Sequence, residues 1–142
     1  MNIMYGNILS AKNYCLLRKS VNFYDIPIEQ VQRALDKSDF VVAAYVDGTP
    51  VGMARLISDG TQILIMDVVV HPDYQGNGIG RGLMERIREY IESTDYDRML
   101  VNLLTDDSKT GFYEKLGYQK AEGMRLWLKR DCIYDRGLCE GV

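Results

Sequence analysis

The chain has 142 residues, 46% of them hydrophobic and 26% charged, a composition typical of one folded globular domain rather than a disordered chain. Its net charge of -3 argues against a nucleic-acid-binding protein, which normally carries a basic patch. No apolar run approaches the roughly 18 residues that span a membrane, and the first ten residues do not resemble a signal peptide. We therefore expect a cytoplasmic protein that binds neither nucleic acid nor membrane.

Cysteine and histidine are scarce in this sequence. The three cysteines, Cys15, Cys132 and Cys139, form no CxxC motif, and His71 is the only histidine. A zinc site normally needs four such ligands, so we expect no metal site. The odd number of cysteines favours reduced thiols, and no Cys–His or Ser–His arrangement suggests a covalent nucleophile.

Two helices are predicted at the start of the chain. The first follows Ser10, a residue type that caps helices well, and the second begins near Pro27, which suits a first helical turn. Three strands follow at 40–46, 50–57 and 61–70, separated by the turn pairs Asp47-Gly48 and Asp59-Gly60. Such short connections predict an antiparallel meander.

The second half alternates helices and strands. We expect a helix from Ile79 to about 92, a strand at 99–104, a short helix from Asp106 or Asp107 to Gly117, a last strand at 124–129 and a loose tail at 131–142. The strand–loop–helix–strand unit should make its two strands parallel. The whole order predicts an α/β domain spanning 1–142, in which an antiparallel meander leads into a strand–loop–helix–strand unit.

Four glycines at alternate positions join the third meander strand to the long helix: Gly76, Gly78, Gly80 and Gly82. The first amides of a helix have no internal partner, and the helix dipole adds about half a positive charge there. Glycines let the backbone approach a phosphate closely, and Arg81 adds a charge. A packing role alone would not need four glycines, so we predict a phosphate or diphosphate site at 76–81.

The two common nucleotide-binding motifs do not fit this stretch. A Rossmann loop needs GxGxxG, and the alternate spacing here leaves the third glycine absent. A Walker loop needs GxxxxGK followed by Ser or Thr, and no lysine follows. The phosphate therefore belongs to another kind of ligand.

The string VVVHPDYQGNGIGRGLM resembles the acetyl-CoA signature of the GNAT superfamily of N-acetyltransferases, which is Q/R-x-x-G-x-G/A between a strand and a helix. Gln75, Gly78 and Gly80 match it. The later GFYEKLGY, residues 111–118, resembles the second motif of that family. Both motifs occur in the family's order, and the resemblance extends over some 130 residues, to about Lys129. It implies the acyl-CoA N-acyltransferase fold, an α/β fold with a mixed, mostly antiparallel twisted sheet of six to seven strands flanked by about four helices. It also implies acetyl-CoA as cosubstrate.

The resemblance also implies site residues. The backbone of Val68, Val69 and Val70 would pair with the pantetheine arm as if with another strand. The amides of Gly76 to Arg81 would hold the diphosphate of CoA. The predicted CoA-binding residues of this loop are Gln75, Gly76, Asn77, Gly78, Ile79, Gly80 and Arg81. The thioester would enter between this strand and the strand at 99–104. Tyr113 would protonate the departing sulfur, and a primary amine would attack the acetyl carbonyl directly, without an acyl-enzyme.

Several positions depart from the family pattern. Asp106 stands where the family often has asparagine, and Lys109 stands where it often has alanine. Lys109 to Tyr113 matches instead a K-x-G-F-Y pattern of small bacterial members, so Lys109 and Phe112 are added to the predicted CoA contacts. The family's frequent glutamate base is missing, and Asp67 is the only carboxylate in that region. Asp67 or an ordered water chain is then the expected base, and an amide at a strand bulge near Val68 the expected oxyanion donor.

The acceptor amine is left open: a small molecule, a polyamine, an aromatic amine or a peptide amine. Family members often pair, so a homodimer is possible. A rival interpretation keeps the same fold and glycine loop in a non-catalytic acyl-CoA sensor or interaction module. The presence of Tyr113 favours the enzyme over the sensor.

Overall fold

The computed structural model describes residues 1–129 and 132–134. These residues belong to two compact units, Met1–Leu104 and Thr105–Val142, and each unit is described by itself. A single N-acetyltransferase domain over 1–142 stays a prediction.

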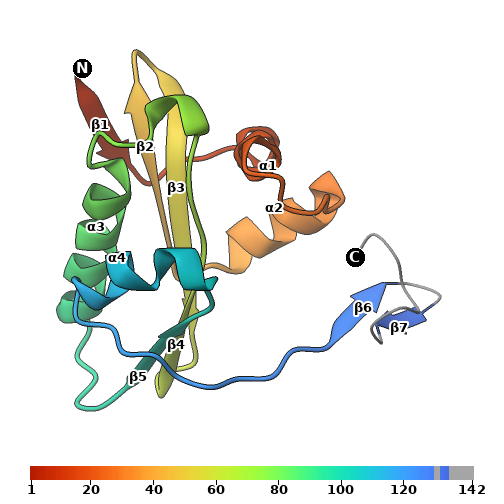
Figure 1. Ribbon diagram of the computed structural model, residues 1–142, viewed down its shortest axis with the longest axis vertical. Helices are drawn as coiled ribbons and strands as arrows, with labels where there is room; N and C mark the ends of the chain where they lie inside the picture. Colours follow the sequence, from red (N-terminus) through yellow and green to blue (C-terminus); the bar gives the residue numbers. More distant parts are fainter. Residues whose placement is uncertain (130–131, 135–142) are drawn as a thin grey trace. The chain divides into compact units, whose positions relative to one another are not determined.

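The first unit is built on one five-stranded sheet in the order β1-β2-β3-β4-β5 (Figure 1). Its strands are β1 (Ile3–Gly6), β2 (Phe40–Val46), β3 (Thr49–Ser58), β4 (Gln62–Val70) and β5 (Leu100–Leu103). Neighbours pair antiparallel except β4 and β5, which pair parallel. This confirms the predicted meander and the predicted parallel unit. Sequence analysis assigned no strand to Ile3–Gly6, because four residues show too little alternation.

Helices cover both faces of this sheet. The long helix α3 (Ile79–Ser93) packs on β2, β3 and β4, and Figure 1 shows it across the sheet from α1 (Ala11–Ser20) and α2 (Ile28–Lys37). The α3 side chains of Ile79, Leu83 and Ile87 are fully buried, as their spacing of four residues predicts. On the α1 face the core cluster comprises Ala11, Tyr14, Leu17, Val31, Met53 and Val69. The sheet therefore has one apolar layer on each side.

The meander turns have the backbone that their sequences require. Asp47 and Gly48 both have positive φ, 50° and 77°, which is the conformation of a tight two-residue hairpin turn. Ser10 caps α1 by accepting a hydrogen bond from the Asn13 N–H at 3.1 Å. Both features confirm predictions made from residue type alone.

The second unit contains a 3-10 turn, η2 (Asp107–Lys109), the short helix α4 (Thr110–Glu114), and a two-stranded antiparallel sheet of β6 (Trp127–Lys129) and β7 (Cys132–Tyr134). The last strand is shorter than predicted: it begins at Trp127, although the apolar alternation begins at Met124. Cys132–Tyr134 is a strand rather than part of a tail, because it pairs with β6. The rest of the predicted tail lies outside the described residues.

The described strands thus form one sheet of five and one of two, with four α-helices, and the mixed α/β class is confirmed. No helix in 1–129 or 132–134 is long and apolar enough to cross a membrane. Within the same residues, no group of three or more His, Cys, Asp or Glu side chains is arranged to hold a metal ion.

Candidate functional site

Strand β4 contains a bulge at Asp67 and Val68. The pairing with β3 passes from Met66 opposite Arg55 to Val69 opposite Met53, so two residues of β4 lie against the single residue between them on β3. Asp67 has φ 53°, a left-handed conformation inside a strand. Bulges of this kind bend a strand and redirect its backbone groups, and they are frequent beside active sites.

The pairing of β4 with β5 stops before β4 ends. The register joins Gln62 to Leu100 and ends at Ile65 with Leu103, whereas β4 continues to Val70. The segment 66–70 therefore extends beyond its parallel neighbour. Its backbone edge on that side is not used by β5, as the predicted role of Val68, Val69 and Val70 in binding an extended ligand arm requires.

The glycine-rich loop leads from β4 into α3 through two left-handed glycines. Gly76 has φ 83°, and Gly78, the N-cap of α3, has φ 78° and no side-chain capping bond. The first internal hydrogen bond of α3 runs from the Gly82 N–H to the Gly78 carbonyl at 3.0 Å. The N–H groups of Ile79, Gly80 and Arg81 precede it and have no acceptor inside the helix. This geometry supplies the amide donors that a phosphate group needs.

Space around the loop fits the same interpretation. A Cβ built at Gly76 or Gly78 meets nothing within 4 Å, so the backbone there is open to a ligand. Gly82 differs, because a Cβ there would overlap the phenol of Tyr5 on β1. The prediction that packing does not require these glycines is therefore wrong for Gly82, which allows α3 to lie close to β1.

Side chains within the loop hold its shape. Gln75 donates from Nε2 to the Val70 carbonyl at 3.0 Å, and Asn77 donates from Nδ2 to the Tyr74 carbonyl at 2.9 Å. His71 accepts the Asp73 N–H on Nδ1 at 3.1 Å, so its side chain caps the short turn that starts at Pro72. Gln75 and Asn77 thus organise the loop that they were predicted to share with CoA.

The electrostatic field at the start of α3 favours an anion. The first turn has no acidic residue. Arg81 is largely exposed and its Nε lies 3.3 Å from the Glu85 carboxylate one turn further along. The exposed pair is weak, so the guanidinium can turn toward a phosphate without a large loss. Helix dipole and guanidinium act in the same direction.

Asp67 is surrounded by donors from two elements. Tyr14 and Arg18 of α1 donate to its two carboxylate oxygens, and Arg55 Nε on β3 lies 3.8 Å from Oδ2. The Asp67 side chain is only 11% exposed. Asp67 as the general base stays a prediction, and any proton that it accepts must compete with these contacts.

Tyr113 lies in the second unit, on α4. Its ring is buried and meets Phe112 edge-on at 4.9 Å and Tyr118 edge-on at 6.0 Å between centroids. Burial, reinforced by Tyr118 and Asp106, raises the pKa of Tyr113 to about 12. The phenol therefore stays protonated near neutral pH, as a proton donor must be.

The remaining predicted residues of this unit surround the start of α4. Asp106 caps η2 and accepts from the N–H of Ser108 at 2.9 Å, and the hydrogen bond from the Ser108 hydroxyl is the main cause of a lowered Asp106 pKa. Lys109 is the exposed N-cap residue of α4. Lys109 and Phe112 as CoA contacts stay predictions.

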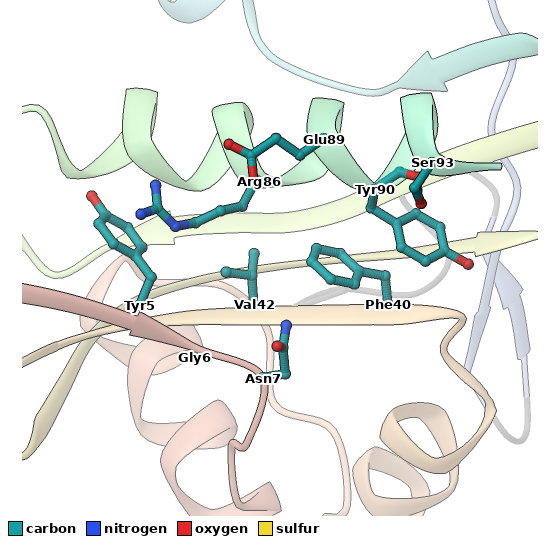
Figure 2. Close-up of a pocket in the computed structure, with 9 residues that line it drawn as sticks. All are labelled: Tyr5, Gly6, Asn7, Phe40, Val42, Arg86, Glu89, Tyr90 and Ser93. Carbon is teal, nitrogen blue, oxygen red and sulfur yellow. The ribbon is translucent and has the colours of Figure 1, made fainter.

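A separate pocket of about 350 Å³ lies between α3 and strands β1 and β2 (Figure 2). Phe40 and Tyr90 stack at 4.6 Å on one side of it, and Arg86 covers the Tyr5 ring at 3.6 Å on the other. Its walls include neither the bulge nor the glycine loop. We therefore assign the candidate site to the β4 edge and the loop, which match the chemistry, rather than to this pocket.

Comparison with known proteins agrees with this geometry. The family description "Acetyltransferase (GNAT) domain" matches residues 36–120, which include β4, the glycine loop and α4. The chain belongs to the GNAT family of acetyltransferases. The resemblance seen in the sequence is thereby confirmed, and the bulge, the open β4 edge and the loop can be interpreted together.

Individual relatives extend the match beyond that segment. An N-acetyltransferase called ycf52, uncharacterized, from Gracilaria tenuistipitata var. liui is 30% identical over 80% of this chain and 63% of its own length. The chloroplastic serotonin N-acetyltransferase 2 of Oryza sativa subsp. japonica is 35% identical over 74% of this chain and 56% of its own. The chain thus spans only part of these relatives' length.

Solved structures show the same fold. A Staphylococcus aureus protein of unknown function, titled a probable acetyltransferase, has a TM-score of 0.83 and 28% identity, covering 90% of this chain and 99% of its own. Arabidopsis thaliana glucosamine-6-phosphate N-acetyltransferase has a TM-score of 0.75 at 16% identity, covering 91% and 100%, a likeness of fold alone. The GNAT fold is confirmed for this chain.

Sequence analysis missed three side chains beside the bulge: Tyr14 and Arg18 of α1 and Arg55 of β3. Tyr14 is a core residue, at 2% exposure, and its hydroxyl also binds Asp67. No local pattern reveals such contacts, since Tyr14 and Asp67 are 53 positions apart. The only sequence signal was a charged residue, Arg18, beside the apolar stripe of a helix.

Proposed function

We propose that this chain is an acetyl-CoA-dependent N-acetyltransferase that transfers the acetyl group to a primary amine by direct attack within a ternary complex. The observation that carries the proposal is that three features follow one another along one segment. Strand β4 has a bulge at Asp67 and continues past the last residue that pairs with β5. After it, the first amides of α3 precede the first hydrogen bond of that helix. One extended thioester ligand with a diphosphate would use all three.

The diphosphate would be held by the backbone of the loop. In this proposal the amides from Gly76 to Arg81 donate to its oxygens, and the Arg81 guanidinium adds charge. Gln75 and Asn77 contribute by holding the loop through their bonds to the Val70 and Tyr74 carbonyls. Bound acetyl-CoA supplies an activated acyl group with a thiolate leaving group.

The acyl end would lie along β4. The backbone of Val68, Val69 and Val70 would pair with the amide groups of the pantetheine arm. The Val68 N–H, within the bulge, would donate to the acetyl oxygen as negative charge develops there. A donor already fixed in position lowers the barrier without reorganisation, and removing one such donor typically costs about 10²–10³ in rate.

Proton transfers complete the proposed reaction. The ammonium group of the acceptor must lose one proton, to Asp67 or to an ordered water chain, before its nitrogen can attack. The C–N bond would then form and the C–S bond break, the proposed donor to the departing sulfur is Tyr113, and the second proton that the nitrogen loses would restore the phenol. Its pKa of about 12 keeps the proton available at neutral pH.

The proposed acceptor class is an aromatic amine. The rice relative's name specifies serotonin, an aromatic amine, and aromatic side chains at Phe23 and Tyr24 are half-exposed beside Arg18 of α1. An aromatic amine is therefore the first acceptor class to test. Homodimerisation and a cytoplasmic location remain predictions from the sequence.

The test is a panel of aromatic amines, polyamines and peptide amines incubated with acetyl-CoA, with free thiol release and acetylated product both measured. Product from one amine class, dependent on acetyl-CoA, is the expected result. Calorimetric binding of CoA with no product from any class would instead favour the non-catalytic sensor. If the protein neither binds CoA nor forms product, the proposal is refuted.

The diphosphate site has its own matched pair of variants. Arg81→Glu reverses the charge in the first turn of α3, whereas Arg88→Glu makes the same change two turns further along the helix. We expect Arg81→Glu to weaken CoA binding by about tenfold, since it replaces a charge-assisted contact with repulsion. Arg88→Glu should leave binding near the wild-type value. Equal effects would show that the anion does not bind at this helix end.

A further inference from the structure

The bulge in β4 is built on an unfavourable backbone conformation. Asp67 has φ 53°, and in an L-residue the left-handed region crowds the Cβ against its own backbone. Asparagine and aspartate tolerate this region better than most residues, but a strand normally excludes it. Something outside the strand must therefore hold Asp67 in place.

The side chain of Asp67 is held from α1. The Tyr14 hydroxyl donates to one carboxylate oxygen and the Arg18 guanidinium donates to the other. Arg18 is also anchored away from the strand, because its second terminal nitrogen donates to the Tyr24 carbonyl at 3.0 Å. A carboxylate bonded at both oxygens to one rigid helix cannot rotate, so the backbone that carries it cannot relax.

Tyr14 is itself fixed in two ways. Its ring belongs to the apolar cluster of α1, α2, β3 and β4 and is 2% exposed. Its hydroxyl accepts the Arg55 Nε–H from β3 at 2.6 Å while donating to Asp67. Burial, with the Asp67 charge, raises its pKa well above the usual value, so the hydroxyl keeps its proton. One side chain thus connects the helix, the bulged strand and the strand opposite the bulge.

Stability alone is a poor explanation for this group. Two arginines share one carboxylate, at 7%, 13% and 11% side-chain exposure, and burying charges costs about as much as their attraction returns. The Nε of Arg18 is buried with no hydrogen-bond partner in the described part of the chain. Apolar side chains of similar volume would pack the same space, but they would not fix the direction of the Asp67 backbone.

We propose that Tyr14 and Arg18 are positioning residues of the acetyl-transfer site, which clamp the Asp67 carboxylate so that the bulge directs the Val68 N–H at the acetyl oxygen. This inference rests on the proposed function. It gives α1 a part in the reaction although none of its residues needs to touch the acyl group. It also gives Asp67 a role that requires no proton transfer.

The decisive measurement is the infrared carbonyl stretch of acetyl-CoA labelled with ¹³C at the acetyl carbon and bound to the protein. A donor at the acetyl oxygen lowers this frequency, and the readout requires no acceptor amine. We expect a downshift in the wild type and a much smaller one in Tyr14→Phe. The kcat of Tyr14→Phe should fall about tenfold, which is less than the effect of deleting an oxyanion donor. Its KM for acetyl-CoA should stay within about twofold of the wild-type value. Tyr45→Phe on β2 is the matched control and should match the wild type.

A second pair of variants separates clamping from proton abstraction. Asp67→Ala and Asp67→Gly both lose the carboxylate, but glycine adopts a positive φ without strain and alanine does not. A clamping role predicts that Asp67→Gly restores much of the carbonyl shift and has a kcat about tenfold above that of Asp67→Ala. If Asp67 acts only as the base, both variants lose activity equally and both keep the carbonyl shift.

The outcomes distinguish this inference from the proposed function. No binding of acetyl-CoA by the wild type would overturn both. Binding with a downshifted carbonyl that is unchanged in Tyr14→Phe would overturn the clamp and leave the proposed function standing. A lost shift in Tyr14→Phe and Asp67→Ala, with recovery in Asp67→Gly, would support the clamp even if Tyr14→Phe is less stable than the wild type.

Discussion

At the scale of single residues, the site depends on polar side chains that are buried together with apolar ones. Tyr113 could be proposed from its motif, because the spacing within GFYEKLGY is local, and its role stays a prediction. Tyr14, Arg18 and Arg55 could not, since their contacts with Asp67 join positions far apart in the chain. A sequence pattern reports which face of a helix is apolar, but not which strand residue a tyrosine hydroxyl on that face will meet.

Tyr113→Phe removes the proposed proton donor and keeps the ring that packs between Phe112 and Tyr118. Turnover should fall by about 10² or more, the usual effect of a general acid. Steady-state kinetics with acetyl-CoA and the best acceptor measures this. Tyr118→Phe is the companion variant and should keep most of the activity. Full activity in the Tyr113→Phe enzyme would exclude this phenol from the mechanism.

The pH dependence of stability follows from the same phenol. The pKa of Tyr113 is about 12 in the folded protein against about 10 in an unfolded chain, so the folded state holds the proton more tightly. The free energy of unfolding should therefore fall as the pH rises from about 10 to about 12, since the unfolded state releases the proton first. Urea unfolding of wild type and Tyr113→Phe across this range should show a shallower decline in the variant. Parallel curves would contradict the assignment.

At the scale of elements, α3 follows the glycine loop at one end, and its Gly82 lies against the Tyr5 side chain of β1. The bounds of α3 were predictable because apolar residues recur every four positions and a run of glycines precedes them. The bulge could not be predicted from the hydrophobic pattern, because three consecutive valines show no alternation that a change of register would interrupt. Only the family resemblance suggested it. Gly82 was misread because its partner, Tyr5, lies on a strand too short to predict.

The contact between Gly82 and Tyr5 can be tested by a double-mutant cycle. Alanine at position 82 gains up to about 1 kcal/mol of helix propensity but meets the Tyr5 phenol, and such overpacking costs about 1–3 kcal/mol. Gly82→Ala should therefore be neutral or destabilising alone, and stabilising in a Tyr5→Ala background. Thermal and urea unfolding of the four proteins gives the coupling. Additive effects would show that the two positions do not touch.

At the scale of the whole molecule, the residues named in the proposal come from both compact units: the loop and the bulge belong to Met1–Leu104, and Tyr113 belongs to Thr105–Val142. The class of fold and the order of elements were predictable because each helix and most strands show their own periodicity. The division of the strands into sheets of five and two was not, since pairing partners leave no periodic signal.

Ligand binding should stabilise the chain as a whole. CoA at about 100 times its Kd adds about 2.7 kcal/mol to the free energy of unfolding, which raises Tm by several degrees. Differential scanning calorimetry with increasing CoA measures this shift. Arg81→Glu should need about tenfold more CoA for the same rise, and Arg88→Glu should follow the wild type. A Tm that does not respond to CoA would remove the basis for a coenzyme site.

Tyr14 occupies the apolar cluster with its ring and the polar group around Asp67 with its hydroxyl. Thermostability and catalytic output are therefore not independent design variables in this chain. An engineer who repacks the α1 layer to raise the melting point also moves the hydroxyl that secures the bulge, and gains in one property are expected to reduce the other. Substitutions in the opposite apolar layer, beneath α3, are expected to raise the melting temperature with less effect on activity.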